Sequence, residues 1–551
     1  MILGFMLSKY QKIINIIFVL GVYLILHLTF FVLSNLTSDI LTDSSFVFKY
    51  LPQILFPLII LVVKSKKFNW SYLEYSSKIK WFILIVAGIL LWENLFLDYN
   101  FYTNSNLVLE KIFLLFFFVL LFFNPLYICL FLLQNFIIWQ SNQSILGSFH
   151  VTDIRPVYDT LTLFLSFLVV KRFRGVHSSI FILLALTMHA SNYFIPGISK
   201  IEISPNGWEW VFLNQLSNLF ISSYVNGWLG FLNEKMIMGI AEIINKNELL
   251  MSSLSVFIEI GSIFLLIKKH ISYLIFIGFQ FLHLGIFFAS GIFFWSWILL
   301  NFGFLFLIHK LDKESLDFLY TKQNLKIFLV LVFMSPLIHQ PSALGWWDTR
   351  LNTVYDFIAT KESGETLKLN RNDFAPYDII FTQNRFYYTS DEKILNGTYG
   401  VIQRNQKKYT KLFWTISNDV IKPLSGRKPK IYKNDSFFIF NQLEQAKDLT
   451  EIKKLIDNYG VNSYDENLKS TLEYFIKTYF KNLNNSNKKN NLFNKLGAPY
   501  HIYDLSEDRF HGDDDIVNIK IYKTNIWWNK ENNEIIRFGE QLISDIYVEE
   551  N

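Results

Sequence analysis

Apolar residues gather into a series of long runs over the first 340 residues, and each run is long enough to cross a membrane or nearly so. The runs cover residues 12–33, 46–63, 81–97, 112–139, 157–170, 178–198, 249–267, 271–289, 292–308 and 326–338. This pattern predicts a mainly α-helical chain, with a polytopic membrane bundle of about nine to eleven helices in residues 1–340. The first run lacks a small-residue cleavage site and is followed by further spans, so we expect it to remain as a helix.

The pattern changes after about residue 340 to charged, aromatic and alternating positions. Strands are predicted at 377–389, 399–403, 411–415 and 516–523, and helices at 442–458 and 464–482. We therefore expect residues 341–551 to form a small soluble α+β domain outside the bundle.

Lysine and arginine collect between the apolar runs, and such residues mark cytoplasmic loops. The basic residues are Lys9 and Lys12; Lys64, Lys66, Lys67, Lys78 and Lys80; Lys171, Arg172 and Arg174; Lys268 and Lys269; and Lys310 and Lys313. They predict a plasma (inner) membrane protein with a cytoplasmic N-terminus. Lys200, residues 199–248 and the C-terminal domain are then extracytoplasmic.

One run conflicts with this orientation, because counting each run as a single span would put Lys171 outside. The run 112–139 is unusually long and is interrupted by Asn124 and Pro125. We interpret it as a hairpin of two short helices or a re-entrant pair, with proline ending the first helix. A kinked single helix, with one neighbouring run not spanning, is the alternative.

Composition agrees with a membrane location. Of 551 residues, 52% are hydrophobic and 18% aromatic, and the mean hydropathy is +0.27, which is too apolar for an ordinary soluble protein. Membrane lipid is the expected surrounding, and the net charge of +5 does not indicate nucleic acid as a partner. The single cysteine, Cys129, has no partner in the chain for a disulfide.

The most informative segment runs from Tyr193 to Lys200 and is followed by Trp208 and Trp210. It predicts a helix that begins near residue 178, ends at Pro196 and Gly197, and presents Lys200 at the membrane boundary. Burial disfavours the charged form of an amine, so a lysine at this depth can serve as a base. The alternative is a lysine that only anchors the helix end by reaching toward the interface.

Other ionisable residues inside apolar runs also need a reason, because their burial is costly. Glu259 and His283 lie in the middle of two successive helices and could meet at similar depth, either in a site or as a packing pair. The remaining candidates are His27, Glu93, Asp153, Arg155, Asp159 and His189. No metal site is evident, since the acidic run 513–515 lacks regular ligand spacing and reads as a solvated turn.

Three segments within residues 10–340 resemble the transmembrane domain shared by vitamin K-dependent gamma-carboxylases and bacterial HTTM proteins. The segments are Tyr193–Lys200 with Trp208 and Trp210; Phe257, Ile258 and Glu259; and Phe281, Leu282, His283 and Leu284 with Gly291 and Trp295. The region from Pro336 to Thr349 then looks like the exit into the outer domain.

This resemblance implies a reaction. In the carboxylases a lysine deprotonates reduced vitamin K, oxygen converts the hydroquinone to a strong base, and a peptide glutamate is carboxylated. Lys200 matches the lysine, and His150 is the nearest upstream candidate for the family's catalytic histidine. The resemblance further implies that Tyr193, Glu259 and His283 bind the cofactor, which would be reduced vitamin K or menaquinol.

Two departures leave the function open. The C-terminal region is shorter than in the carboxylases and has no segment that matches their propeptide-binding region, and no cysteine is available for the disulfide of the animal enzymes. The first hypothesis is a quinol-dependent, carbon–carbon bond-forming enzyme that modifies an exported peptide or protein. The second is a non-catalytic membrane partner for maturation, export or immunity of a secreted peptide. A transporter is disfavoured because no inverted repeat is evident.

Overall fold

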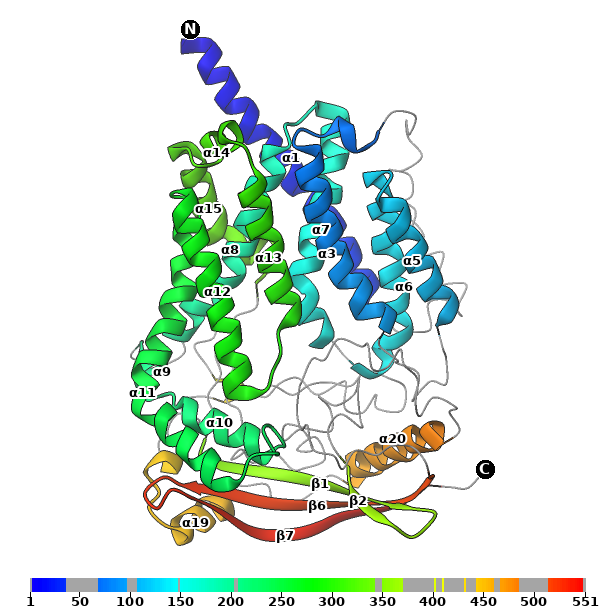
Figure 1. The fold of residues 1–551 in the computed structure, drawn as a ribbon, viewed down its shortest axis with the longest axis vertical. Helices are drawn as coiled ribbons and strands as arrows, with labels where there is room; N and C mark the ends of the chain where they lie inside the picture. Colours follow the sequence, from blue (N-terminus) through cyan, green and yellow to red (C-terminus); the bar gives the residue numbers. More distant parts are fainter. Residues whose placement is uncertain are drawn as a thin grey trace.

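The computed structural model places most of the chain in helices, with a small antiparallel sheet formed near its C-terminal end. It describes residues 2–35, 68–96, 107–146, 149–202, 207–341, 349–369, 401–402, 409–410, 431–432, 442–459, 466–484 and 514–548. Figure 1 shows an elongated helical bundle with the sheet lying across one end and the N-terminus of the chain at the opposite end. The prediction of a mainly helical chain is confirmed.

The long helices follow the apolar runs. They are α1 (Ile2–Asn35), α3 (Ser76–Phe96), α5 (Val108–Leu121), α6 (Ile128–Leu146), α7 (Phe149–Arg174), α8 (Ser179–Glu202), α11 (Glu234–Gly261), α12 (Lys269–Ser290), α13 (Trp295–Lys310) and α15 (Lys322–Ile338). Shorter helices are α9 (Glu209–Leu213), α10 (Leu216–Val225) and α14 (Lys313–Leu319). The predicted run 46–63 lies outside the described residues.

Five segments of the described residues are long and apolar enough to cross a membrane. They are Tyr10–Thr29, Ser76–Phe96, Ser179–Glu202, Glu234–Phe264 and Lys269–Ser290. The segment that contains α8 is almost wholly buried inside the bundle, whereas only a minority of the residues of the α1, α11 and α12 segments are buried. Helix α8 is therefore the central helix, and its polar residues have to find partners within the protein.

The run 112–139 forms two helices, α5 and α6, so the prediction of two helices is confirmed and the kinked single helix is wrong. The chain turns at Asn124, whose side chain accepts a hydrogen bond of 2.9 Å from the Leu126 amide. Pro125 follows at the first position of a short 3₁₀ helix, where its missing N–H costs nothing. Gln134 of α6 donates to the Glu110 carbonyl of α5 at 3.0 Å, which fixes the two helices side by side.

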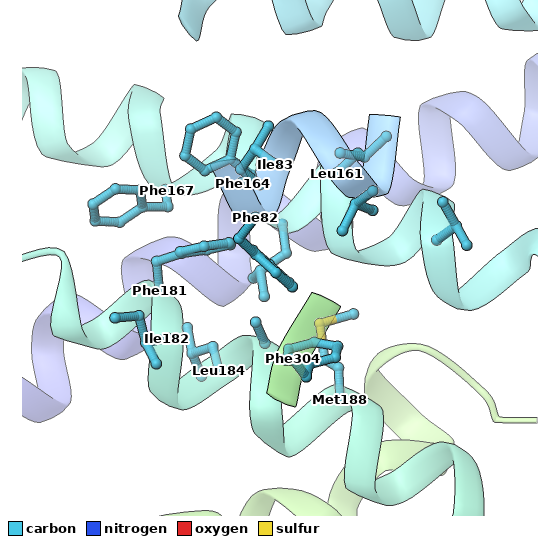
Figure 2. Packing of buried hydrophobic residues seen from close by; sticks show 14 of the residues in the cluster. Phe82, Ile83, Leu161, Phe164, Phe167, Phe181, Ile182, Leu184, Met188 and Phe304 are labelled. Atoms are coloured by element: carbon cyan, nitrogen blue, oxygen red, sulfur yellow. The ribbon is translucent and has the colours of Figure 1, made fainter. Parts of the chain in front are cut away.

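Aromatic side chains fill the space between α3, α7, α8 and α13 (Figure 2). The rings of Phe82 and Phe304 lie 4.8 Å apart, and Phe181 of α8 lies 5.1 Å from Phe164 and 5.7 Å from Phe167. Tilted and edge-to-face pairs of this kind add about 0.5–1.5 kcal/mol each beyond the burial of their area. The large number of phenylalanines thus serves to pack the bundle around α8.

Basic residues from separate loops meet at the end of the bundle that lies away from the sheet. Lys78, at the start of α3, pairs with Asp312 at 2.7 Å, and Arg174, at the end of α7, donates to Asn15 of α1 at 3.4 Å. Lys12 of α1 bonds to Asn324 of α15. The loops that the sequence assigned to one side of a membrane therefore lie together in space.

The sheet joins segments that are far apart in the chain. Its order is β2-β1-β6-β7, all antiparallel, with β1 (Leu351–Lys361), β2 (Thr366–Lys368), β6 (Ile516–Asn529) and β7 (Glu534–Tyr547). Three further two-residue strands, β3 (Val401–Ile402), β4 (Tyr409–Thr410) and β5 (Ile431–Tyr432), form a second sheet. Helices α19 (Leu449–Tyr459) and α20 (Glu466–Asn484) complete the described C-terminal region.

Three of the six C-terminal elements that the sequence predicted are present among the described residues. The strand at 516–523 is part of β6, and the helices at 442–458 and 464–482 correspond to α19 and α20. The strands predicted at 377–389 and 411–415 lie outside the described residues, and only Val401–Ile402 of the one at 399–403 is described. The domain boundary near residue 340 stays a prediction.

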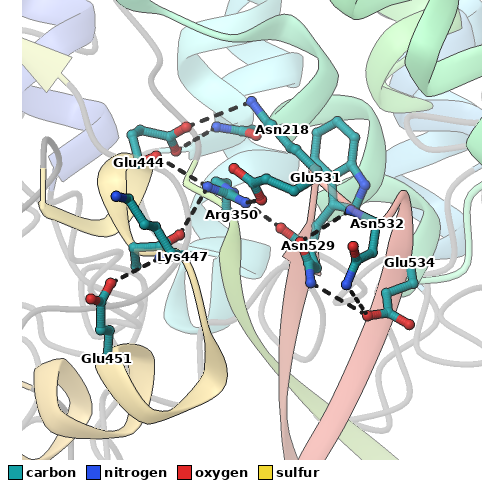
Figure 3. Close-up of polar contacts among 12 residues, drawn as sticks. Asn218, Arg350, Glu444, Lys447, Glu451, Asn529, Glu531, Asn532 and Glu534 are labelled. Carbon is teal, nitrogen blue, oxygen red and sulfur yellow. Dashed lines mark hydrogen bonds and ion pairs between the residues drawn. The ribbon is translucent and has the colours of Figure 1, made fainter.

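Arg350 holds the first strand of the sheet against its neighbours (Figure 3). Its guanidinium is buried and donates to the Trp528 carbonyl at 3.0 Å, to the Glu444 carbonyl at 3.1 Å and to the Ala446 carbonyl at 3.2 Å. Burial raises the pKa of the Glu444 carboxyl above its ordinary value, although the cations of Lys530 and Arg350 oppose this shift. The strand and the segment that leads into α19 are thereby fixed together.

Glu74 forms a polar clip at the opposite end of the bundle. It accepts hydrogen bonds of 2.6 and 2.8 Å from the buried Lys171 amine, 2.9 Å from the Ser178 amide and 2.6 Å from the Ser178 hydroxyl. Burial alone would raise the pKa of the Glu74 carboxyl, but these hydrogen bonds outweigh it and hold the pKa at about 2. The clip ties the segment before α3 to the turn between α7 and α8.

We expect Glu74→Gln to destabilise the protein by about 1–3 kcal/mol, because the Lys171 amine loses its counter-charge. The folded-state pKa lies below the ordinary value of 4.5, so this stabilisation is complete above pH 4.5 and is lost as the pH falls toward 2. The free energy of unfolding, measured from neutral pH down to about pH 3, should fall more steeply for the wild type than for Glu74→Gln. Asp312→Asn, at an exposed pair, is the control; equal loss of stability in both variants would contradict the clip.

Candidate functional site

Lys200 lies inside α8, and the predicted helix end at Pro196 and Gly197 is wrong. The helix continues through both residues to Glu202, so Lys200 occupies its last turn and is only 8% exposed. Proline is tolerated inside an apolar helix when neighbouring helices pack against the bend. The lysine is thus held in the protein interior, next to α11, and does not sit free at a helix end.

Gly197 is the reason that α11 can come close to α8. A Cβ atom at this position would lie 2.9 Å from the Glu259 Cβ, 3.0 Å from the Ile260 Cγ1 and 3.2 Å from the Ile260 amide nitrogen. Any side chain larger than hydrogen would therefore push the two helices apart. The close approach is what brings the Glu259 carboxylate within reach of α8.

Lys200 and Glu259 form a buried ion pair. The Lys200 amine donates a hydrogen bond to Glu259 Oε1, and their side chains are 10% and 7% exposed. The amine also lies 5.2 Å from the centre of the Trp210 ring of α9, where the ring face favours a cation. Glu259 Oε2 has no hydrogen-bond partner among the described residues, so one carboxylate oxygen remains able to accept a proton or a hydrogen bond.

Tyr193 is the centre of a second polar group on the same helix. Its hydroxyl lies 2.7 Å from His283 Nε2 of α12, and Asn301 Nδ2 of α13 donates to it at 2.9 Å. Its ring stacks on Phe279 with centroids 3.5 Å apart. Asn301 Oδ1 in turn lies 2.6 Å from His189 Nε2. These contacts form one chain of hydrogen bonds across three helices.

The two groups share one face of α8, because residues 189, 193 and 200 are separated by four and seven positions. Glu259 lies within electrostatic range of Tyr193, and Lys200 within range of His283. The structure differs here from the sequence expectation that Glu259 and His283 meet. Glu259 bonds to Lys200 and His283 bonds to Tyr193, since α8 lies between them and supplies a partner to each.

Polar atoms around Tyr193 remain without hydrogen bonds to any described residue. They are Glu259 Oε2, His283 Nδ1, His189 Nδ1 and the Trp297 indole nitrogen. The Trp297 ring lies 5.4 Å from Tyr193 and 5.5 Å from His283. Buried polar atoms normally have partners, so hydrogen-bonding capacity is concentrated here beside aromatic faces.

His150 lies near the start of α7, in a segment whose backbone is helical. Its side chain is outside the described residues, so its relation to Lys200 stays a prediction. Trp208 is 43% exposed, whereas Trp210 is buried against the site. Within the described residues, no group of three or more His, Cys, Asp or Glu side chains is arranged to hold a metal ion.

A second polar network on the other side of α8 includes residues that the sequence did not assign to a site. The Tyr23 hydroxyl donates to Asp159 Oδ1 at 2.8 Å, and His27 Nδ1 lies 3.2 Å from the same oxygen. Ser191 Oγ lies 2.8 Å from His339 Nε2. Arg155 pairs with Asp159 at 3.7 Å and also donates to the His339 carbonyl.

Only part of this network carried a sequence signal. His27, Arg155 and Asp159 stand out as ionisable residues within or next to apolar runs. Tyr23, Ser191 and His339 carry no such signal, and their role depends on helices that meet only in the folded chain. The network joins α1, α7, α8 and the end of α15, where the chain leaves the bundle.

Comparison of the chain with known protein families, with curated proteins and with solved structures found no match.

We expect Gly197→Ala to destabilise the protein by about 1–3 kcal/mol, because the added methyl group overlaps Glu259 and Ile260. Thermal unfolding of the purified protein measures this effect. The control is Gly285→Ala in α12, where an added Cβ meets nothing within 4 Å and alanine favours the helix. Equal stability of the two variants would show that α8 and α11 do not touch at Gly197.

Proposed function

We propose that this chain is a polytopic membrane protein that uses the buried Lys200–Glu259 pair to take a proton from a quinol, in the manner of the vitamin K-dependent gamma-carboxylases. The observation that carries this proposal is the position of the Lys200 amine. It is buried, bonded to a carboxylate, and lies on the face of α8 that also carries Tyr193 and its partner His283.

The membrane assignment is supported by the five long apolar segments. These segments give eleven spans, within the range of about nine to eleven expected from hydropathy, when they are counted together with α5, α6, α7, α13, α15 and the run 46–63. The hairpin of α5 and α6 supports the orientation, because counting the run 112–139 as two crossings agrees with Lys171 and Arg174 lying on the cytoplasmic side.

The orientation is further supported by the two ends of the bundle. Basic loops gather at the end near the N-terminus, and the sheet lies at the other end (Figure 1). By the positive-inside rule, the N-terminus is cytoplasmic and residues 341–551 are extracytoplasmic. A reporter enzyme fused after residue 345 tests this: it should be active outside the cytoplasm, and activity inside would overturn the orientation.

The Lys200–Glu259 pair can supply a base without water. In a low-dielectric interior an ion pair has little advantage over the neutral amine and acid, because both charges have lost their hydration. Transfer of one proton from the Lys200 ammonium to Glu259 therefore leaves a free amine at low cost. That amine can then accept a proton from a hydroxyl placed beside it, while Glu259 holds the first proton.

The aromatic and polar groups around Tyr193 suit a quinol. The Trp297 indole nitrogen, His283 Nδ1 and Glu259 Oε2 have no hydrogen-bond partner among the described residues and can bond to its hydroxyl groups. Reduced vitamin K or menaquinol would supply an acidic hydroxyl and, with oxygen, the strong base that carboxylation needs. The substrate would be an exported peptide or protein that reaches the site from the side of the sheet.

A non-catalytic role is the second candidate, and one observation favours it. The Lys200 amine already has a carboxylate partner, and a pair of this kind can serve only to join α8 and α11. The protein would then act as a membrane partner for maturation, export or immunity of a secreted peptide, with the C-terminal region as its binding surface.

One assay separates the two candidates. Purified protein is given reduced vitamin K or menaquinol, oxygen, labelled bicarbonate and glutamyl peptides, and incorporation of label into the peptide is measured. We expect Lys200→Ala to lower incorporation by about 10²–10⁴-fold, the usual contribution of a general base. Lys246→Ala, at an exposed lysine of α11, should retain wild-type incorporation. No incorporation by the wild type across several peptides and quinols would contradict the enzymatic role.

A further inference from the structure

Helix α11 connects the sheet to the Lys200 site without a break. It runs from Glu234 to Gly261. One face of it is turned inward along its whole length, and the inward residues are Ile237, Met238, Ala241, Ile244, Ser252, Val256 and Glu259. Glu248 lies on this same face, eleven positions before Glu259, which corresponds to about three turns and about 16 Å. Any shift of α11 at Glu248 is therefore carried to Glu259.

Glu248 is bonded to the first turn of α10. Its Oε1 atom accepts a hydrogen bond of 3.1 Å from the Ser217 amide and a second from the Ser217 hydroxyl. The beginning of a helix favours a carboxylate, because its free amides carry partial positive charge. The Lys530 amine, in the turn between β6 and β7, lies within electrostatic range of the same carboxylate.

Helix α10 is itself held by the sheet. Asn218 donates to Glu444 at 2.8 Å, and Glu444 belongs to the segment that Arg350 fixes (Figure 3). Apolar side chains of α10 and α11 pack on one face of the sheet; they are Phe220, Ile221, Ile237, Met238, Ala241 and Ile244, against Val354, Ile526, Trp528 and Ile535. The Ser217 bonds thus connect α11 to a fixed support.

The contact at Gly197 does not set the position of α11 along its own axis. A glycine presents a smooth surface, so it limits how closely the helices approach but does not resist sliding. A partly buried carboxylate that accepts two hydrogen bonds does resist sliding, because displacement breaks both bonds at once. Glu248 is the carboxylate of α11 that makes such bonds to α10, while Glu242 is exposed and pairs with Lys246 of its own helix.

We propose that Glu248 is a positioning residue that fixes the register of α11 and thereby holds Glu259 opposite Lys200. This inference rests on the proposed function only in treating Lys200 as the reactive group. Among the described residues, those recorded near the Lys200 amine include Glu259 of α11, Trp210 of α9 and, at longer range, His283 of α12. Of these, Glu259 is the one that α11 carries.

The test measures the reactivity of Lys200 without any substrate. Full-length protein is treated with methyl acetimidate, a small membrane-permeant reagent for neutral amines, and modification of Lys200 is followed by mass spectrometry. We expect Lys200 to be modified at least about fivefold faster in Glu248→Ala than in the wild type. A change of this size is in the range usual for coupled sites. Glu248→Gln, which still accepts a hydrogen bond, should lie closer to the wild type.

The matched control is Glu242→Ala, which removes an exposed carboxylate from the same helix and should leave the rate of Lys200 modification unchanged. If Glu248→Ala does not fold, Ser217→Ala takes its place, because it removes the hydroxyl donor and keeps the amide. The proposal would be overturned if Lys200 is modified at the wild-type rate in a folded Glu248→Ala or Ser217→Ala variant. Absence of carboxylation would not, because reactivity is measured independently of the reaction.

Discussion

A lysine that is buried as an ammonium in an apolar helical bundle requires a carboxylate partner, and the packing of α8 against α11 follows from that requirement. An unpaired ammonium in such surroundings costs several kcal/mol, so Lys200 can occupy α8 only if Glu259 is brought to it. Glu259 reaches it because Gly197 lets α11 approach closely. The pairing of α8 with α11 is thus a condition for burying the charge.

The same requirement explains the distribution of the other polar residues. Helix α8 is central and nearly all of its residues are buried, so its polar side chains find partners within α8 or on several neighbouring helices. Tyr193 reaches α12 and α13, and Ser191 reaches the end of α15. Two polar networks therefore lie on opposite sides of one helix, within a bundle otherwise packed by phenylalanine.

Local sequence signals predicted the elements well but not their contacts. Apolar runs located the helices, and Asn124 with Pro125 indicated the hairpin, because turn chemistry acts over a few residues. The helix end at Pro196 and Gly197 was wrong because these signals assume a solvated chain, whereas tertiary packing holds α8 together there. Lys200 and Glu259 are 59 positions apart, and no local pattern could identify them as partners.

The strand pairing of the sheet could not be predicted from local sequence patterns either, because the paired segments are far apart in the chain. Strand β1 begins at Leu351 and pairs there with Trp527 of β6. Because this pairing joins segments at opposite ends of the C-terminal region, alternation along either strand alone could not reveal it. The contact of the sheet with α10 and α11 likewise depends on helices in the 207–248 segment, which the apolar runs did not mark.

A double-mutant cycle on Lys200 and Glu259 tests the central claim most directly. The free energy of unfolding is measured for Lys200→Met, Glu259→Gln and the double variant. If the pair is buried and joined, each single change should cost about 3–5 kcal/mol, and the double change should cost clearly less than their sum, since no unpaired charge remains. Additive costs, within about 0.5 kcal/mol, would show that the two residues do not interact and would contradict the account.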